Sequence, residues 1–368
     1  MTKKKTKSEM EIVPTSGTVT SPLVIPADDV EETVVLEEET TIDPDNHPNF
    51  IEGNTSAITL EELSEKCIVP TFADNTLTIA NQSFIESVME AGKTVFGELT
   101  PVEIRVSHQV NGRIPTALYK KASELTDEEK TVYYQRLAFV CHVAALSRSV
   151  NGQLVHLCIG GVRAYNEDKL YGRQSPMKFK IFCGWQVRVC SNLMLTCDGF
   201  TGNLECMTTS DIKEKALELF NGFDPKKDDN LRTLEALGNT SISEEQFCKA
   251  VGRLRLFQAL PTNTKTELGL PNVTLGDQAV NAVVRGYVDN PNFKKEDGSD
   301  TITLWQLLQL FNEAVKQTYI DRWLERNQVG HYIFWLCSEV IAQGFQSVKL
   351  FIPQKHVDAR NQYCRGFW

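Results

Sequence analysis

The pattern of apolar and polar positions is clearest in the middle of the chain, where it predicts an antiparallel sheet. Two apolar, β-prone runs lie on either side of Asn151-Gly152. Asn-Gly between such runs predicts a two-residue hairpin turn, because both turn residues must accept a positive φ. A third strand is expected at residues 177–190, a shorter hairpin over residues 193–207, and an alternating strand in "PVEIRVSH" ahead of the central hairpin.

Helical spacing of apolar residues surrounds this predicted sheet. Residues 83–96 form one such segment, which ends at Gly97, and residues 211–220 form another. Strands followed by helices predict an α+β fold, in which an antiparallel sheet around the central hairpin packs on helices and the C-terminal half is mostly helical. Helices of that half are expected over residues 243–260, 276–288, 303–328 and 331–343.

Composition divides the chain into three parts. Residues 1–55 are rich in Thr, Pro, Glu and Asp and contain almost no aromatic side chains. Such a segment cannot bury enough apolar surface to offset the entropy lost on ordering, so we expect a disordered acidic tail. Residues 56–225 are expected to form the α+β domain that holds the sheet, and residues 226–368 a helical region packed on it.

The formal net charge of −10 is distributed unevenly. Residues 1–52 contain four lysines and twelve acidic residues, which gives a net charge of −8. Residues 101–188 contain 13 Lys and Arg residues and 7 acidic residues, which gives +6. The acidity therefore belongs to the tail, and the middle of the chain is locally basic.

The cysteines and the N-terminus indicate the compartment. The chain has ten cysteines and no CxxC pair, and no apolar run follows the N-terminal lysines as it would in a signal peptide. No stretch reaches the roughly 18 apolar residues of a membrane-spanning helix. These features predict a cytoplasmic protein with reduced, mostly buried thiols.

The histidines of the central hairpin are candidate metal ligands, together with Cys141 and Cys158. A two-residue turn at Asn151-Gly152 sets the register of the hairpin, and that register places His142 and His156 on opposite faces of the sheet. The two imidazoles then cannot bind one ion unless a bulge shifts the register. We therefore predict structural histidines and no metal site.

No catalytic or cofactor motif is recognisable in the sequence. The patterns GxSxG and HExxH and both phosphate-loop patterns are missing, and the glycine pair in "IGGV" is interpreted as close backbone packing or a bulge inside a strand. The sequence favours a non-enzymatic function without a cofactor. An enzyme built on Cys190, Ser191 and Asn192 stays open as a third possibility.

A run of basic and aromatic residues in the centre predicts binding of nucleic acid, in which cations follow the phosphates and aromatic rings stack on bases. The polar face of the third strand belongs to this run, so we expect its cations to converge with the others on one open surface. The candidate residues for phosphate contacts are Arg148, Arg163, Lys169, Arg173, Lys178, Lys180 and Arg188, and the candidate stacking residues are Tyr165 and Tyr171.

Four segments of the sequence resemble an uncharacterised family, domain of unknown function 3871. They are "EIRVSHQVNGRIP", "IGGVRAYN", "LYGR" and "KIFCGWQVRVCSNL". The resemblance runs from about residue 60 to the C-terminus and implies a bacterial accessory protein that travels with mobile elements and phages. More distantly, "RVCSNL" and "TLWQLLQLFNEAVK" are similar to the phage/plasmid-like family called domain of unknown function 932, although Asn192 here runs directly into Leu193 without that family's glycine.

Two functions remain open after the sequence analysis. The first is a nucleic-acid-binding accessory protein of a mobile element or phage, with single-strand binding or annealing suggested by the order of three strands and a helix, a fold-level analogy. The second is a factor that binds a host protein and modulates a host system, for example against a defence, through the acidic tail or through Phe367 and Trp368 at the C-terminus.

Overall fold

A computed structural model describes residues 48–70, 78–168, 176–187, 192–194, 201, 203–225, 234–267, 275–289 and 301–327 of the chain. All of these residues belong to one unit that spans residues 44–368. The predicted tail over residues 1–47 and the predicted helix over residues 331–343 lie outside the described residues. Among the described helices, none has both the length and the apolar character needed to cross a membrane.

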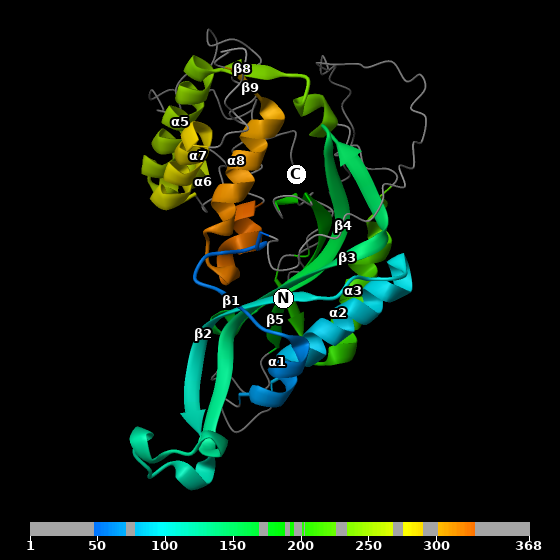
Figure 1. Ribbon diagram of the computed structural model, residues 1–368, viewed down its shortest axis with the longest axis vertical. Helices are drawn as coiled ribbons and strands as arrows, with labels where there is room; N and C mark the ends of the chain where they lie inside the picture. The colour runs from blue at the N-terminus through cyan, green and yellow to red at the C-terminus, as the bar shows by residue number, and fades with distance from the viewer. Residues whose placement is uncertain are drawn as a thin grey trace, which may run out of the picture. The chain divides into compact units, whose positions relative to one another are not determined.

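A curled antiparallel sheet forms the centre of this unit and confirms the predicted α+β fold (Figure 1). The strands follow one another in the order β1 to β6, and β7 also pairs with β5. Their bounds are β1 (Ser56–Ala57), β2 (Glu103–Arg113), β3 (Lys130–Val150), β4 (Gln153–Ala164), β5 (Met177–Val187), β6 (Leu193–Met194) and β7 (Leu204–Cys206).

The central hairpin joins β3 to β4 where the sequence predicts it. Asn151 and Gly152 have φ angles of 50° and 75°, which are the positive values that the predicted turn requires. A register shift lies between His142 and Ser147 of β3. Because a one-residue slip turns every later side chain to the other face, this bulge changes which side chains are neighbours on the sheet.

The short hairpin expected over residues 193–207 is not formed. Both β6 and β7 pair antiparallel with β5, through Met194 opposite Trp185 and Cys206 opposite Met177. Thr201, which lies between them in sequence, donates its backbone N–H to the carbonyl oxygen of Ile181 at 3.2 Å. The described residues of this segment therefore lie along one edge of β5, where their backbone groups find hydrogen-bond partners.

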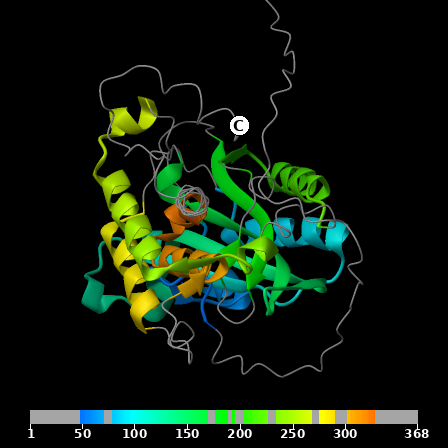
Figure 2. The ribbon, with the colours of Figure 1, turned by 90° about the horizontal axis from the view of Figure 1, so that it is seen from above.

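One face of the sheet packs on two helices, α2 (Asn81–Phe96) and α3 (Thr209–Gly222), and we call it the α2 face. The ring of Phe84 in α2 lies 5.3 Å from that of Phe139 and 4.8 Å from that of Phe179, centroid to centroid. Figure 2 shows α2 and α3 side by side, on the side of the sheet away from α5 and α7. Both helices match segments that their apolar spacing predicts.

The opposite face of the sheet is also covered. Helix α8 (Leu304–Lys316) leads through a turn into a helix over residues 320–327. Trp323 of this 320–327 helix lies between Phe182 of β5 and Phe50, at centroid distances of 5.6 and 5.2 Å. Strand β5, which the sequence predicts to have one polar, open face, is therefore buried on both faces.

The ordered region begins earlier than predicted. Phe50 and Ile51 are fully buried, and the backbone N–H groups of Glu52 and Gly53 donate to the carbonyl oxygen of Lys316 at 2.9 and 3.0 Å. The prediction that disorder extends to residue 55 is therefore wrong for residues 48–55. The overlooked signal is the apolar pair Phe50-Ile51, which buries enough surface to offset the ordering cost of this short segment.

A strand followed by a helix occurs twice in the C-terminal half. The units are β8 (Ser241–Ser243) with α5 (Glu244–Ala259), and β9 (Thr301–Thr303) with α8. The two strands pair antiparallel around Ile242 and Ile302, and both helices start with the same capping box, Ser243 with Gln246 and Thr303 with Gln306. The remaining helices are α1 (Leu60–Lys66), α6 (Thr262–Glu267) and α7 (Asp277–Asp289).

Candidate functional site

Five of the nine predicted nucleic-acid-binding residues can be placed in the structure. Lys169, Tyr171, Arg173 and Arg188 lie outside the described residues. The five that are described are Arg148, Arg163, Tyr165, Lys178 and Lys180.

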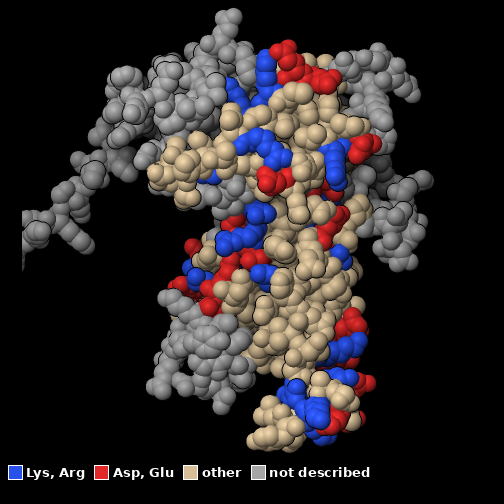
Figure 3. Space-filling view, turned by 90° about the vertical axis from the view of Figure 1, so that its left-hand side faces the viewer, with Lys and Arg blue, Asp and Glu red and all other residues tan. Residues whose placement is uncertain are grey.

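The described surface carries charges of both signs. The described residues include 22 Lys and Arg and 28 Asp and Glu, a balance of 22 − 28 = −6. Figure 3 shows Lys and Arg side chains interspersed with Asp and Glu on the face that it presents. A strong, non-specific attraction to phosphates requires a cationic stripe or patch, and this face does not present one.

The five described residues do not share one surface. Arg163 pairs with Phe179, whose ring contacts Phe84 of α2, so Arg163 lies on the α2 face. Lys180 pairs with Val162, the neighbour of Arg163 in β4, so Lys180 lies on the opposite face. The expectation that these cations converge on one open surface is therefore wrong for the described residues, because it assumed that β5 leaves one face to solvent.

Arg163 and Tyr165 are buried and bind protein groups. Arg163 is 1% exposed, and its Nη1 donates to the carbonyl oxygen of Ile79 and, at 3.3 Å, to Oδ1 of Asn81. Its guanidinium lies 4.4 Å from the ring centroid of Tyr165, and burial lowers the pKa of Arg163 and raises that of Tyr165. These two residues tie the start of α2 to the sheet and are not placed to contact a nucleic acid.

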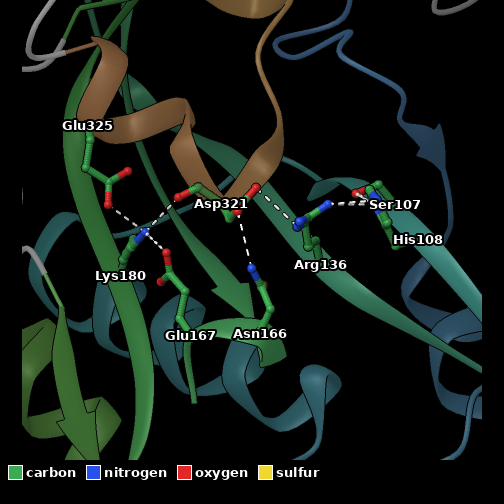
Figure 4. A network of polar contacts seen from close by, with 8 residues as sticks. All are labelled: Ser107, His108, Arg136, Asn166, Glu167, Lys180, Asp321 and Glu325. Carbon is green, nitrogen blue, oxygen red and sulfur yellow. Dashed lines mark hydrogen bonds and ion pairs between the residues drawn. The ribbon is translucent and has the colours of Figure 1, made fainter. Parts of the chain in front are cut away.

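Lys180 is buried at the centre of an ion network (Figure 4). Its Nζ lies 3.0 Å from Oε1 of Glu167 and 2.6 Å from Oε1 of Glu325, and it donates to the carbonyl oxygen of Asp321 at 2.9 Å. Because an ammonium group has three N–H donors, these contacts use all of them. Lys180 therefore holds the 320–327 helix on the sheet.

The network continues through the side chain of Asp321 (Figure 4). Nε of Arg136 lies 3.1 Å from Oδ1 of Asp321, close enough for an ion pair but not aligned as a hydrogen bond. Nη1 of Arg136 lies 2.7 and 2.9 Å from the two ring nitrogens of His108, a β2 residue with a φ of 57°. The guanidinium also lies 5.6 Å from the ring centroid of Tyr319, in the turn before the 320–327 helix.

Four basic side chains share the sheet face on which Lys180 lies, and we call it the cationic face. Adjacent strands place Arg105, Ala138, Val162 and Lys180 in one row across the sheet. The next row on the same face holds Arg136, two residues before Ala138, and Lys178, two residues before Lys180. Burial lowers the pKa of Arg105. The cationic face consists of Arg105, Arg136, Lys178 and Lys180.

Some buried polar atoms of the cationic face and of the helix that covers it lack hydrogen-bond partners. Among the described residues, four buried polar atoms of the cationic face and of the two carboxylates over it, Asp321 and Glu325, make no hydrogen bond. Each such atom has lost hydration without a protein partner of good geometry. These atoms are Arg105 Nε, Arg136 Nε, Asp321 Oδ1 and Glu325 Oε2.

A second candidate site is the two-stranded arm, residues 109–134, formed by the ends of β2 and β3. Pairing of these strands continues from Gln109–Tyr134 to Arg113–Lys130, whereas β4 pairs with β3 only from Arg136 onward. In Figure 1 the arm runs away from the sheet at the bottom of the view. Its tip, residues 114–129, carries the short helices η3 (Pro115–Ala117), η4 (Ala122–Glu124) and η5 (Asp127–Glu129).

The tip of the arm presents two large side chains to solvent. Tyr119 is 99% exposed and Leu118 is 59% exposed. The backbone around them is held in place, because Ile114 N–H donates to the carbonyl oxygen of Glu129 at 3.0 Å and Arg113 Nη1 donates to that of Lys120. Sequence reasoning missed this site, although an adjacent Leu-Tyr pair in a polar connection between two strands was a usable signal.

The histidines of the hairpin are closer than predicted. The bulge in β3 brings His142 and His156 to the same face, with ring centroids 5.7 Å apart, and Nε2 of His142 lies 2.6 Å from Oε1 of Gln186. The prediction of opposite faces is therefore wrong, because it assumed a regular register throughout the hairpin. Within the described residues, no group of three or more His, Cys, Asp and Glu side chains is arranged to hold a metal ion.

The geometry defines an α+β protein whose sheet lies between two helical layers and extends into an arm. The chain belongs to the family described as "Domain of unknown function, B. Theta Gene description", domain of unknown function 3871, whose family model matches residues 29–348. No curated protein and no solved structure matches the chain.

Proposed function

We propose that this protein is a non-enzymatic accessory factor that binds a partner protein through the tip of its arm. The observation that carries this proposal is the exposure of Tyr119 beside Leu118 on an ordered tip. Tyrosine is enriched at interaction hot spots, because it supplies a large contact area at a low cost in side-chain entropy. The fixed backbone lowers the cost further, since little ordering is left for the moment of binding.

The charge of the tip favours a protein over a nucleic acid. Between residues 113 and 130, four basic side chains stand against four acidic ones, and Lys120 and Lys130 are paired with Glu129 and Asp127. Phosphate binding draws on an excess of cations, whereas a neutral, mixed rim around an aromatic anchor is typical of protein interfaces.

The family resemblance supplies the setting of this proposal. A chain that travels with mobile elements or phages acts in the cytoplasm of its bacterial host, and its partner is then a host protein or a protein of the same element. Such a partner needs an apolar pocket that accepts a tyrosine ring, with charges of both signs around the pocket.

Affinity capture from a bacterial host lysate tests the arm. The variant Leu118→Ala/Tyr119→Ala should lose a partner that the wild type retains, with a loss of affinity of about thirtyfold for a hot spot of about 2 kcal/mol. The control is Tyr319→Ala, which removes an exposed tyrosine outside the arm and should keep the partner. Equal capture by the arm variant and the wild type would contradict the proposal.

Nucleic-acid binding is the second candidate function, and the observation that favours it is the alignment of four basic side chains on the cationic face. Arg148 is exposed and Lys178 is half-buried, so both can reach a ligand in solution. Polarisation of labelled single-stranded DNA at two salt concentrations tests this function. Nucleic-acid binding is supported if Arg148→Ala/Lys178→Ala and added salt both weaken the affinity for DNA. If the protein in this conformation does not bind DNA even at low salt, the function is rejected for this conformation.

A further inference from the structure

The 320–327 helix places two carboxylates over the cationic face. Asp321 and Glu325 are one helical turn apart and lie on the same side of the helix, where they contact Arg136 and Lys180. Figure 4 shows both pairs on that side, with Glu167 approaching Lys180 from the short helix η6 (Tyr165–Glu167) that follows β4. Two anionic groups spaced by a helical turn, about 6 Å apart, approximate two neighbouring phosphates of a single strand.

We propose that the cationic face is a latent binding surface for the phosphates of single-stranded nucleic acid, and that the 320–327 helix is an autoinhibitory cover whose carboxylates occupy the phosphate positions. This inference rests on the second candidate function, because it names the surface and the regulation of nucleic-acid binding. It is independent of the arm.

The free-energy cost of replacing the 320–327 helix by a nucleic acid is limited, because phosphates can take the place of the carboxylates beside the buried cations. Removing a carboxylate from a buried cation is strongly destabilising if nothing replaces it, because a buried charge is left without a partner. A phosphate that enters as the helix leaves provides a new anionic partner, so Lys180 and Arg136 remain paired in both states. Arg105 Nε makes no hydrogen bond, and Arg136 Nε meets Asp321 only as an ion pair, so both N–H groups can donate hydrogen bonds to a phosphate.

The cover is a separate element. A turn at residues 317–319 divides it from α8, so it can leave the sheet while α8 stays in place. Its largest apolar anchor is Trp323, which is 1% exposed between Phe50 and Phe182 and has the buried Ile320 and Leu324 beside it in the helix. This anchor keeps the closed state dominant, and it explains why nucleic-acid binding by the wild type is expected to be weak.

A gain of binding tests the proposal. Asp321→Asn/Glu325→Gln removes the two carboxylates without changing the shape of the helix. We expect it to bind labelled single-stranded DNA about tenfold more tightly than the wild type at low salt. Contact with about four phosphates gives a slope of log K against log salt of about −3. The charge-matched control is Glu61→Gln/Glu65→Gln on the exposed side of α1, which should not gain binding.

A reversal test identifies the surface. Adding Lys180→Ala and Arg136→Ala to the amide variant should return binding to the wild-type level and make the salt slope shallower by about 1.4. Trp323→Ala opens the cover by a second route and should give the same gain. Circular dichroism shows that each variant is folded, and the same titrations with single-stranded RNA show whether the sugar matters.

The outcomes are decisive in both directions. If the amide variant and Trp323→Ala both fold but bind single-stranded DNA no more tightly than the wild type, the 320–327 helix is not an autoinhibitory cover. The same conclusion follows if the gain in affinity survives the loss of Lys180 and Arg136. If the wild type binds single-stranded DNA and none of these substitutions changes the affinity, nucleic acid binds to another surface. That result would support the second candidate function and reject the proposed role of the 320–327 helix. Failure of the arm variants to lose a protein partner leaves this inference untouched.

Discussion

At the scale of single residues, burial rather than residue type decides what each charged or nucleophilic side chain does. Lys178 and Lys180 are two positions apart on the same strand face, yet Lys180 is 1% exposed and ion-paired, whereas Lys178 remains half-buried. The difference comes from the 320–327 helix, which lies more than a hundred residues further along the chain. A lysine in a strand pattern predicts a polar face but not what will cover it.

The buried thiols should make the free energy of unfolding depend on alkaline pH. Burial raises the pKa of Cys141 to about 12 and that of Cys158 above its usual range. A thiol whose folded pKa is raised keeps its proton in the folded state while the unfolded chain loses it, so stability is lost as pH rises above about 9. At about pH 10, each thiol should lower the free energy of unfolding by about 1.4 kcal/mol.

Chemical denaturation at pH 8 and pH 10 measures this difference. The variant Cys141→Ala/Cys158→Ala should show a smaller difference between the two pH values than the wild type. Alkylation by iodoacetamide at pH 8 should modify the exposed Cys248 and leave Cys141 and Cys158 unmodified until the protein unfolds. Rapid modification of Cys158 in the folded protein would contradict the buried position.

At the scale of elements, β4 shows why "IGGV" needs its two glycines. A Cβ atom at Gly160 would lie 2.1 Å from the carbonyl oxygen of Phe139 and 2.5 Å from the Phe182 ring. A Cβ atom at Gly161 would lie 2.5 Å from the Phe84 ring. Close backbone packing is confirmed, and it lets the ring of Phe182 on one face and that of Phe84 on the other approach the middle of the sheet.

Replacing Gly160 should therefore destabilise the sheet. Gly160→Ala forces β4 away from β3 or displaces Phe182, and we expect the free energy of unfolding to fall by about 3 kcal/mol. The matched control is Gly252→Ala in α5, where an added Cβ meets nothing within 4 Å. That change should raise stability by about 0.5–1 kcal/mol, because alanine favours a helix interior. Urea unfolding measures both, and equal effects would refute the packing argument.

At the scale of the whole molecule, the residues that stabilise the described unit and the residues proposed to bind a partner lie in different parts of it. Buried apolar side chains form a continuous core through the sheet and its two helical layers. The tip of the arm contributes little to that core, since among its described residues Ala117 is the only buried hydrophobic side chain. An element that carries little stability is free to carry binding residues.

Shortening the arm should separate the two roles. Replacing residues 112–131 by Asn-Gly joins Asn111 to Val132, which are paired in the present register, through a two-residue turn that suits a hairpin. We expect the melting temperature to change by less than about 4 °C, equivalent to about 1 kcal/mol or less, while the captured partner is lost. A large loss of stability would show instead that the arm belongs to the folding unit.

Much of the local structure follows from the sequence because local rules determine it. Asn151-Gly152 specifies its turn through its φ preferences, the alternation along β5 specifies which side chains share a face, and helical spacing specifies α2 and α3. The pairing of β6 and β7 with β5 and the bulge after His142 escaped prediction, because pairing with β5 and β4 overrides local pattern at those points.

The sequence by itself determined the α+β class, the central hairpin and the two faces of β5, since these depend on side-chain period and on turn chemistry over a few residues. Only the tertiary structure decided that the basic face of β5 is covered by the 320–327 helix, that Arg163 lies on the other face, and that Tyr119 stands exposed on an arm. Burial and ion pairing depend on segments that meet across more than a hundred positions, and no local pattern encodes such meetings.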